Sequence, residues 1–188
     1  EFILRRLTQS IRNASQIGAE FWVFHPGLHS GLSWVRPEED WQINMDSISS
    51  LCAFAEKLGV EPLIENMPAP LHFMLRTAKD FERFYSCHCW EKPEIAFDVG
   101  HANTVKQVET FLDKHWMRIR HVHVHDNFGE FDQHNVVGEG TVDWLTFASK
   151  ISRKDACSIV IESFLGAEKS LRKLRSLLSQ ATSSRIKS

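Results

Sequence analysis

The feature that most constrains the fold is a regular alternation of two hydrophobic patterns. Apolar residues recur at helical spacing over residues 4–17, 41–58, 77–86, 103–115, 141–152 and 167–179. Short apolar runs at 20–27, 61–66, 94–100, 118–126 and 157–163 lie between them and are typical of buried strands. Such alternation indicates parallel βαβ units whose helices cover the sheet. We therefore predict an α/β protein, built as an open doubly wound sheet or as a barrel.

Composition narrows the protein class. The chain has 188 residues, of which 43% are hydrophobic, so we expect one globular domain over residues 1–180 and a polar tail over 181–188. A net charge of −2 and a pI near 6.6 argue against nucleic acid as the main partner. No run approaches the roughly 18 apolar residues of a membrane span, so we expect a cytoplasmic protein without a membrane partner.

The four cysteines occur at positions 52, 87, 89 and 157. They are scattered through a chain that is large enough to fold without disulfides, so we expect reduced thiols. The segment Cys87-His88-Cys89 offers zinc ligands as an alternative, but structural zinc sites favour Cys-x2-Cys spacing and a second ligand pair.

The carboxyl end of every predicted strand carries a residue that can bind a metal. These residues are His25, Glu65, Asp98, His123 and Glu162, and each follows an apolar residue that strand alternation sends to the opposite face. No glycine-rich phosphate loop follows any strand, which argues against a nucleotide-binding open sheet. In a (β/α)8 barrel, by contrast, the carboxyl ends of the strands converge on one mouth. We expect the five side chains to meet there.

Carboxylate oxygen together with imidazole nitrogen favours a hard or borderline divalent ion: Mn, Zn, Co or Mg. His101 lies three residues after Asp98, and Asp132 and His134 occupy a loop after the histidine-rich strand, so all three are further candidates. The alternative for each residue alone is a turn or cap. For the whole set, the alternative is a polar network without a metal.

The segments FHPG, IEN, FDVGHAN, HVHVHDNFGEFDQHNVVGEG and IES, in this order and spacing, resemble the xylose isomerase-like TIM barrel superfamily over about residues 20–165. The closest pattern is the sugar phosphate isomerase and epimerase group, and apurinic-site nucleases of the endonuclease IV type are related. The resemblance implies a (β/α)8 barrel that is incomplete here, with five C-terminal βα units and without the first three.

What the resemblance implies for the site can be stated residue by residue. One divalent ion would be held by Glu65, Asp98, His123 and Glu162. The two glutamates would also act as acid and base on a small sugar, polyol or sugar phosphate, and His101 would contact a substrate oxygen. The chemistry is proton transfer next to a carbonyl that the metal polarises.

Two alternatives remain open. A nuclease-like protein would hold two or three zinc ions, with His25, His101, Asp132 and His134 as additional ligands. A barrel fragment that binds metal without turnover is the second alternative, although the presence of both Glu65 and Glu162 argues against it.

Residues outside the proposed ligand set have other expected roles. His121, His125 and Asp126 are expected to hydrogen-bond the ligands or to make the mouth polar. His29, Trp34 and Trp41 are candidates for lining the mouth, and the alternative for the tryptophans is packing against neighbouring helices. Because five strands do not close a barrel, we expect a homo-oligomer or a companion chain to complete it.

Overall fold

The computed structural model describes residues 2–87, 90–154 and 157–186. Five parallel strands form one sheet in the order β1 (Phe21–Phe24), β2 (Glu61–Glu65), β3 (Glu94–Asp98), β4 (Ile119–Val124) and β5 (Ser158–Ile161). All five lie inside the predicted ranges, and strand order follows chain order. This arrangement confirms the α/β class and an incomplete (β/α)8 barrel.

Helices alternate with the strands. They are α1 (Phe2–Gln16), α2 (Pro37–Lys57), α3 (Ala78–Ser86), α4 (Val99–Thr104), α5 (Val108–Lys114), α6 (Trp144–Ile151) and α7 (Ala167–Ile186), with short 3₁₀-helices η1 (Gly31–Trp34) and η2 (Trp116–Arg118). Local sequence explains their starts: α2 has Pro37 at its first turn followed by three acids. At α3, Thr77 and Asp80 form a reciprocal capping box.

Several helix bounds differ from the sequence prediction. The helix expected at 141–152 begins at Trp144, and the helix expected at 167–179 continues to Ile186, into the expected polar tail. The helix expected at 103–115 is two helices, because the chain turns at Lys106, whose φ is 58°. The helix expected at 41–58 begins earlier, at Pro37. A proline and a run of acids are ordinary start signals, but they precede the first apolar residue of the periodic pattern.

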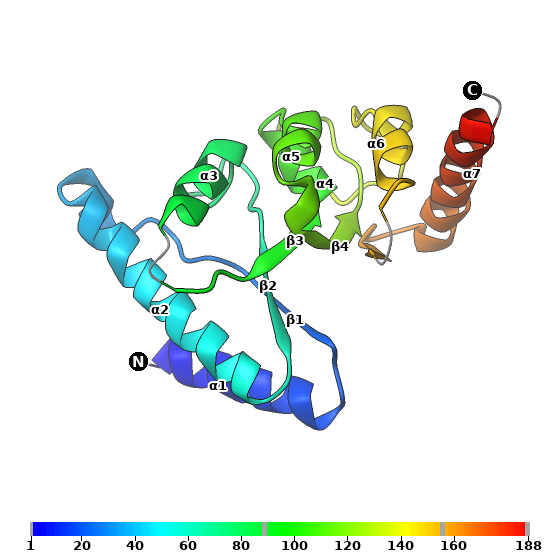
Figure 1. Cartoon of the computed structure of the whole chain (residues 1–188). Coiled ribbons are helices and arrows are strands. Elements are labelled where there is room, and N and C mark those ends of the chain that lie inside the picture. The colour runs from blue at the N-terminus through cyan, green and yellow to red at the C-terminus, as the bar shows by residue number, and fades with distance from the viewer. Residues whose placement is uncertain (1, 88–89, 155–156, 187–188) are drawn as a thin grey trace.

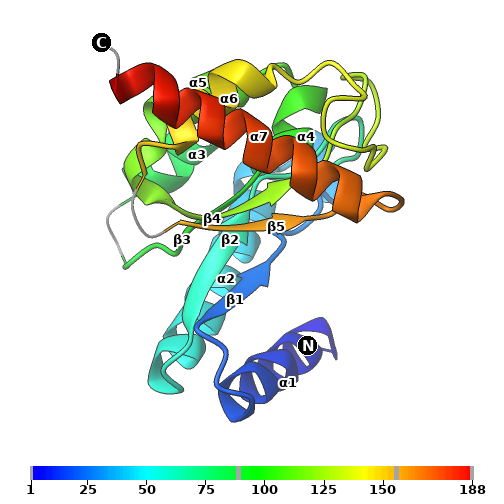
Figure 2. The ribbon, with the colours of Figure 1, turned by 90° about the vertical axis from the view of Figure 1, so that its right-hand side faces the viewer.

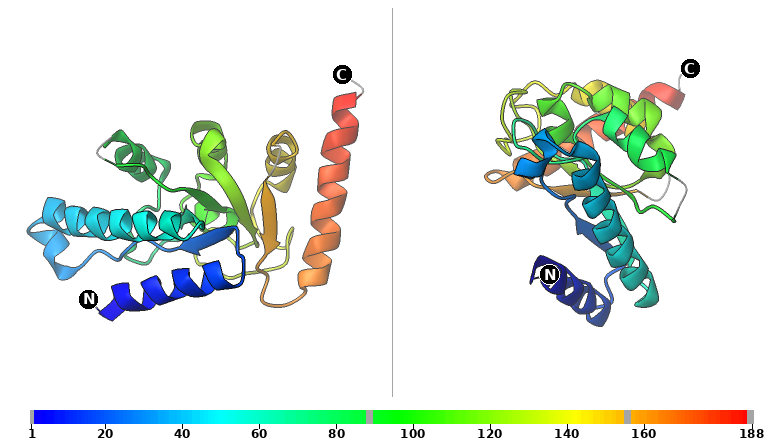
Figure 3. Two further views of the ribbon diagram at one scale, coloured as in Figure 1. Left: turned by 60° about the horizontal axis from the view of Figure 1, so that its bottom comes forward. Right: turned by 90° about the vertical axis from the view of Figure 1, so that its left-hand side faces the viewer.

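The helices form an arc around the outer side of the curved sheet, with α1 and α2 beside the β1 edge and α7 beside the β5 edge (Figures 1 and 3). Figure 2 shows α7 crossing in front of the strands. The main core lies between the sheet and the helices and includes the apolar residues that precede the strand-end ligands: Phe24, Ile64, Phe97, Val122 and, partly buried, Ile161. Their burial on the outer side leaves the side chains that follow them for the inner side.

Cys52 and Cys157 have free thiols, as expected, whereas Cys87 is in a disulfide. His88 and Cys89 lie outside the described residues, and so does the zinc alternative that depends on them. Among the helices that the structure describes, none combines the length and apolar character needed to cross a bilayer.

Candidate metal centre

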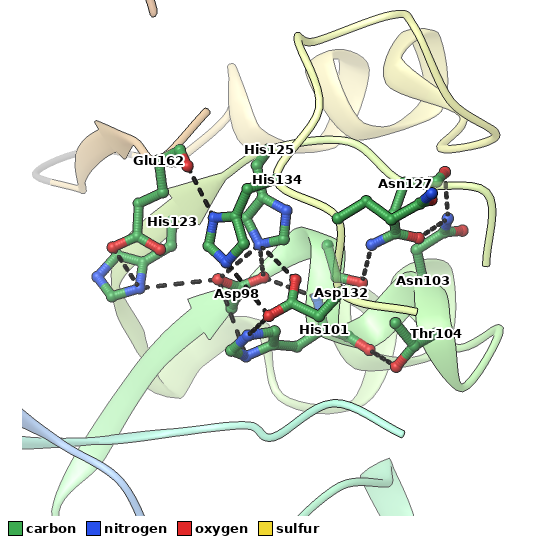
Figure 4. A network of polar contacts seen from close by, with 12 residues as sticks. Asp98, His101, Asn103, Thr104, His123, His125, Asn127, Asp132, His134 and Glu162 are labelled. Carbon is green, nitrogen blue, oxygen red and sulfur yellow. Dashed lines mark hydrogen bonds and ion pairs between the residues drawn. The ribbon is translucent and has the colours of Figure 1, made fainter. Parts of the chain in front are cut away.

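Four of the predicted ligands meet at the carboxyl ends of the strands. Glu65, Asp98, His123 and Glu162 place one ligand atom each within 4.8 Å of one another; we call them the primary cluster. Nδ1 of His123 lies 3.0 Å from Oε1 of Glu65, 3.8 Å from Oδ2 of Asp98 and 3.5 Å from Oε1 of Glu162. Glu162 is half-buried and the other three are buried. Figure 4 shows His123 and Glu162 at the left of the polar network and Asp98 nearer its centre.

The strand ends are joined by Asn66, the residue after Glu65. Its side-chain amide donates to the carbonyl of Asp98 (2.9 Å), and its side-chain oxygen accepts from the backbone N–H of Asp98 (2.8 Å). The carboxylate of Asp98 also caps α4 by accepting from the backbone N–H of His101 at 2.7 Å. The two hydrogen bonds from Asn66 fix the position of Asp98 along its strand relative to Glu65.

A second cluster lies beside the first and consists of His101, His125, Asp132 and His134, again with ligand atoms within 4.8 Å. Oδ2 of Asp132 is 3.2 Å from Nε2 of His101 and 3.2 Å from Nε2 of His134. The ring of His134 stacks between His125 (3.8 Å between centroids) and Phe164 (4.3 Å). The loop after β4 thus folds back to bring Asp132 and His134 over α4 (Figure 4).

Asp98 connects the two clusters. Nε2 of His125 lies 3.0 Å from Oδ1 and 3.2 Å from Oδ2 of Asp98, and His125 has no exposed surface. The imidazole packs directly on Gly100, where an added Cβ would lie 2.0 Å from Cε1 of His125. Glycine at position 100 is therefore required by the close approach of this ring.

The structure places the remaining candidates as follows. His25 joins the primary cluster from the mouth, with Nε2 3.1 Å from Oε2 of Glu65 and 57% of its side chain exposed. His125, expected to support the ligands or to make the mouth polar, is in the second cluster. The signal for His125 was its spacing from His123, since residues two apart share a strand face.

Other residues from the histidine-rich stretch, from the loop before α2 and from α2 itself lie outside both clusters. Nδ1 of His121 contacts Oγ of Ser158 at 2.6 Å. Asp126 is buried and accepts hydrogen bonds from the loop that follows it. His29 lies near Asp40, and Trp41 packs under the guanidinium of Arg83 at 4.1 Å.

Electrostatic coupling within the clusters shifts several pKa values. Burial acts to raise the pKa of Glu65, but hydrogen bonds with His123 and His25 outweigh it and lower the pKa to about 2. Burial raises the pKa of Glu162, and the charges of Asp98 and Glu65 add to the effect. Burial acts to lower the pKa of His101, yet the charge of Asp98 and the hydrogen bond to Asp132 raise it to about 9.

The residues present fit a divalent cation. The primary cluster combines three carboxylates with one imidazole, a donor set that suits hard or borderline ions. In the second cluster, Oδ1 of Asp132 and Nδ1 of His125 are buried and have no hydrogen-bond partner among the described residues. Buried polar atoms are normally satisfied, so these two indicate room for a further donor, a water molecule or an ion.

Comparisons with known proteins identify relatives of the chain. The chain is 31% identical over 149 residues to protein MJ1614 of Methanocaldococcus jannaschii, an uncharacterized protein, covering 78% of this chain and 56% of that one. It thus spans about half the length of that relative.

Among solved structures, a D-tagatose 3-epimerase-like protein has a TM-score of 0.85 and 27% identity, with 94% of this chain and 68% of that one covered. The IOLI protein with a bound zinc atom has a TM-score of 0.74 and 17% identity, with coverages of 97% and 69%. The family model of the xylose isomerase-like TIM barrel matches residues 1–179 of the chain. The chain therefore belongs to the xylose isomerase-like TIM barrel family.

Proposed function

We propose that the chain is a divalent-metal-dependent isomerase or epimerase of a small sugar, polyol or sugar phosphate. The observation that carries the proposal is the primary cluster, in which two glutamates, an aspartate and a histidine from different strand ends meet within 4.8 Å. The likeness to a D-tagatose 3-epimerase-like protein, at 27% identity, supports the substrate class.

Glu65, Asp98, His123 and Glu162 would hold the ion, and the zinc in the IOLI protein of the same fold supports this role. When bound, the ion would supply Lewis acidity next to the substrate carbonyl. Proton transfer at the neighbouring carbon needs a base that removes the proton and an acid that returns one. Glu65 and Glu162 are the proposed pair. They reach the cluster from β2 and from the end of β5, with β3 and β4 between them.

Two histidines would assist the pair. His25, at the mouth, contacts Oε2 of Glu65 and so orients that carboxylate. His101 is held by a hydrogen bond between its Nδ1 and the backbone carbonyl of Asn66, at 2.8 Å. Its Nε2 faces Asp132 and the cavity lined by Glu65 and Glu162, where we propose that it contacts a substrate oxygen.

The proposal is tested by hydrogen exchange. The protein is freed of metal with a chelator and reloaded with Mn, Co, Mg or Zn. It is then incubated with D-tagatose or D-fructose in D2O, and deuterium at the carbon next to the carbonyl is followed by NMR. We expect metal-dependent exchange that Glu162→Gln abolishes. The matched control is Glu168→Gln, an exposed acid paired with Arg172 on α7, which should exchange normally. Near-normal exchange in Glu162→Gln would rule out the assigned role.

The second cluster favours one alternative, a hydrolase or apurinic-site nuclease with two or three zinc ions. Metal analysis of the purified protein separates the two functions. One Mn, Co or Mg per chain supports the epimerase, whereas two or three zinc ions with cleavage of abasic DNA support the nuclease. Absence of metal after growth in metal-replete medium contradicts both.

A further inference from the structure

A groove lies next to the cavity of the candidate metal centre, and one short segment of the chain separates the two. The backbone N–H of His29 donates to the carbonyl of His72 (2.7 Å), and that of Met74 donates to the carbonyl of Gly27 (3.0 Å). These bonds make a short antiparallel ladder, and we call residues 71–74 the strap. Leu71 and Phe73 of the strap line a cavity of about 400 Å³ with Glu65, His101 and Glu162. His72 lines a groove of about 450 Å³ instead.

The wall of this groove is held in place by a buried acid. Asp40, in the first turn of α2, is 7% exposed. Its carboxylate accepts from the backbone N–H (3.1 Å) and the hydroxyl (2.7 Å) of Ser30, and from the hydroxyl of Ser33. Ser30 in turn caps η1 by accepting from the N–H of Leu32 at 3.1 Å. The loop that carries His29 and Trp34 is therefore fixed before any ligand arrives.

The groove presents a large aromatic surface with polar groups around it. Trp34 is 86% exposed and stacks on no other ring among the described residues. His29, Ser30, Ser33 and His72 complete the lining with Gly31. An exposed aromatic face next to a few fixed donors and acceptors suits a ligand that has both an apolar face and hydroxyl groups.

Charge argues against a phosphorylated ligand. The described residues that line the groove and the neighbouring cavity include no lysine and no arginine. Hydrogen bonds from Ser33 and Ser30 hold the pKa of Asp40 below its ordinary value, so a negative charge lies behind the groove wall. Proteins that bind phosphate groups ordinarily supply arginine, lysine or a glycine-rich loop.

We propose that the groove is a subsite for a second, uncharged sugar ring of an extended substrate, with Trp34 under the ring and His29 and His72 at its hydroxyl groups. The inference rests on the proposed function, because it assigns the reacting sugar to the cavity on the other side of the strap. It narrows that function from sugars and sugar phosphates to uncharged glycosides.

Two derivatives of fructose, both substituted at O6, test the proposal. Isomaltulose is fructose with a glucosyl ring on O6, and fructose 6-phosphate has a phosphate there. Isothermal titration of the metal-loaded protein should give a dissociation constant for isomaltulose about tenfold below that for D-fructose, equivalent to about 1.4 kcal/mol. Fructose 6-phosphate should bind no tighter than D-fructose.

Variants test whether the tighter binding of isomaltulose comes from the groove. Trp34→Ala should reduce the ratio of the dissociation constant for D-fructose to that for isomaltulose to about one. Trp34→Phe should keep most of the tenfold ratio. The matched control is Met117→Ala, which removes another exposed apolar side chain (83% exposed) outside the groove and should leave the ratio unchanged.

Three results would overturn the proposal: no gain for isomaltulose, a gain that survives Trp34→Ala, or tighter binding of fructose 6-phosphate than of isomaltulose. Its failure differs from failure of the proposed function. If D-fructose exchanges deuterium but isomaltulose binds no tighter, only the subsite is wrong. If isomaltulose binds through Trp34 but no sugar exchanges deuterium, only the catalytic proposal is wrong.

Discussion

At the scale of single residues, the two clusters depend on a close approach between His125 and the backbone of α4. The ring of His125 lies over Gly100, donates from Nε2 to the carboxylate of Asp98, and stacks on His134. One buried imidazole thus contacts members of both clusters. A methyl group at position 100 would push the ring away, because an added Cβ has no room there. We infer that Gly100 and His125 determine the spacing of the two clusters.

Cys52 provides a test of burial that is independent of the metal centre. Its thiol is 1% exposed in α2, and burial, assisted by the charge of Glu56, raises its pKa from 9.0 to about 12. Because only the thiolate reacts, its fraction at pH 8 falls about a thousandfold. We expect alkylation of Cys52, followed by mass spectrometry, to be at least about 100-fold slower in the native protein than in urea.

The same shift has a defined sign for stability. Between pH 9 and 12 the unfolded chain loses the Cys52 proton while the folded chain keeps it, so this thiol contributes stability below pH 9 that declines as pH rises. Cys52→Ala removes this dependence and serves as the control. A native alkylation rate within about tenfold of the unfolded rate would contradict the burial argument.

At the scale of elements, the sequence predicts the strands better than the connections. The hydrophobic periodicity and the turn residues between segments located all five strands, because the apolar residues that mark the strands face the helices and are buried. The break between α4 and α5 was not predictable, since Lys106 adopts a positive φ without glycine. The role of His125 depends on a loop that folds back on β4, which local periodicity does not encode.

Asp126 holds this loop and gives a test at the element scale. Its buried carboxylate accepts from the N–H groups of Asn127 (2.9 Å), Gly138 (2.9 Å) and Val142 (3.3 Å), and from Nε1 of Trp144 (2.6 Å). Asp126→Asn replaces one acceptor oxygen with a donor, leaving buried N–H groups unpaired. We expect a loss of about 3 kcal/mol in the free energy of unfolding by urea.

The matched control for Asp126 is Asp113→Asn. Asp113 is an exposed acid that pairs with Lys150 on α6, and exposed pairs contribute at most about 1 kcal/mol. Because Asp126 anchors the loop that carries Asp132 and His134, its variant should also bind metal more weakly. Equal urea midpoints for the two variants would show that the loop does not depend on Asp126.

At the scale of the whole molecule, the sheet has two open edges, β1 and β5, in the described chain. Parallel sheets are normally covered on both faces. Here the helices cover one face, while Val160 on β5 is 43% exposed, and Phe164 and Leu165, just after β5, are 76% and 84% exposed. Unpaired strand edges beside exposed apolar side chains favour association with another chain.

We therefore expect this 188-residue chain to self-associate through its β5 edge, most simply as a dimer, although a companion chain could cover the same edge. Sedimentation velocity over a range of concentrations should show a species heavier than 21.7 kDa. Val160→Lys places a charge at the edge and should weaken association at least about tenfold, because burying an unpaired ammonium costs more than 1.4 kcal/mol. Met117→Lys, at an exposed apolar residue of η2 that is not part of the β5 edge, should have no effect. A compact monomer at all concentrations, unchanged by Val160→Lys, would mean that the open edge is stable in water, and the metal centre would then have to function in the half-barrel alone.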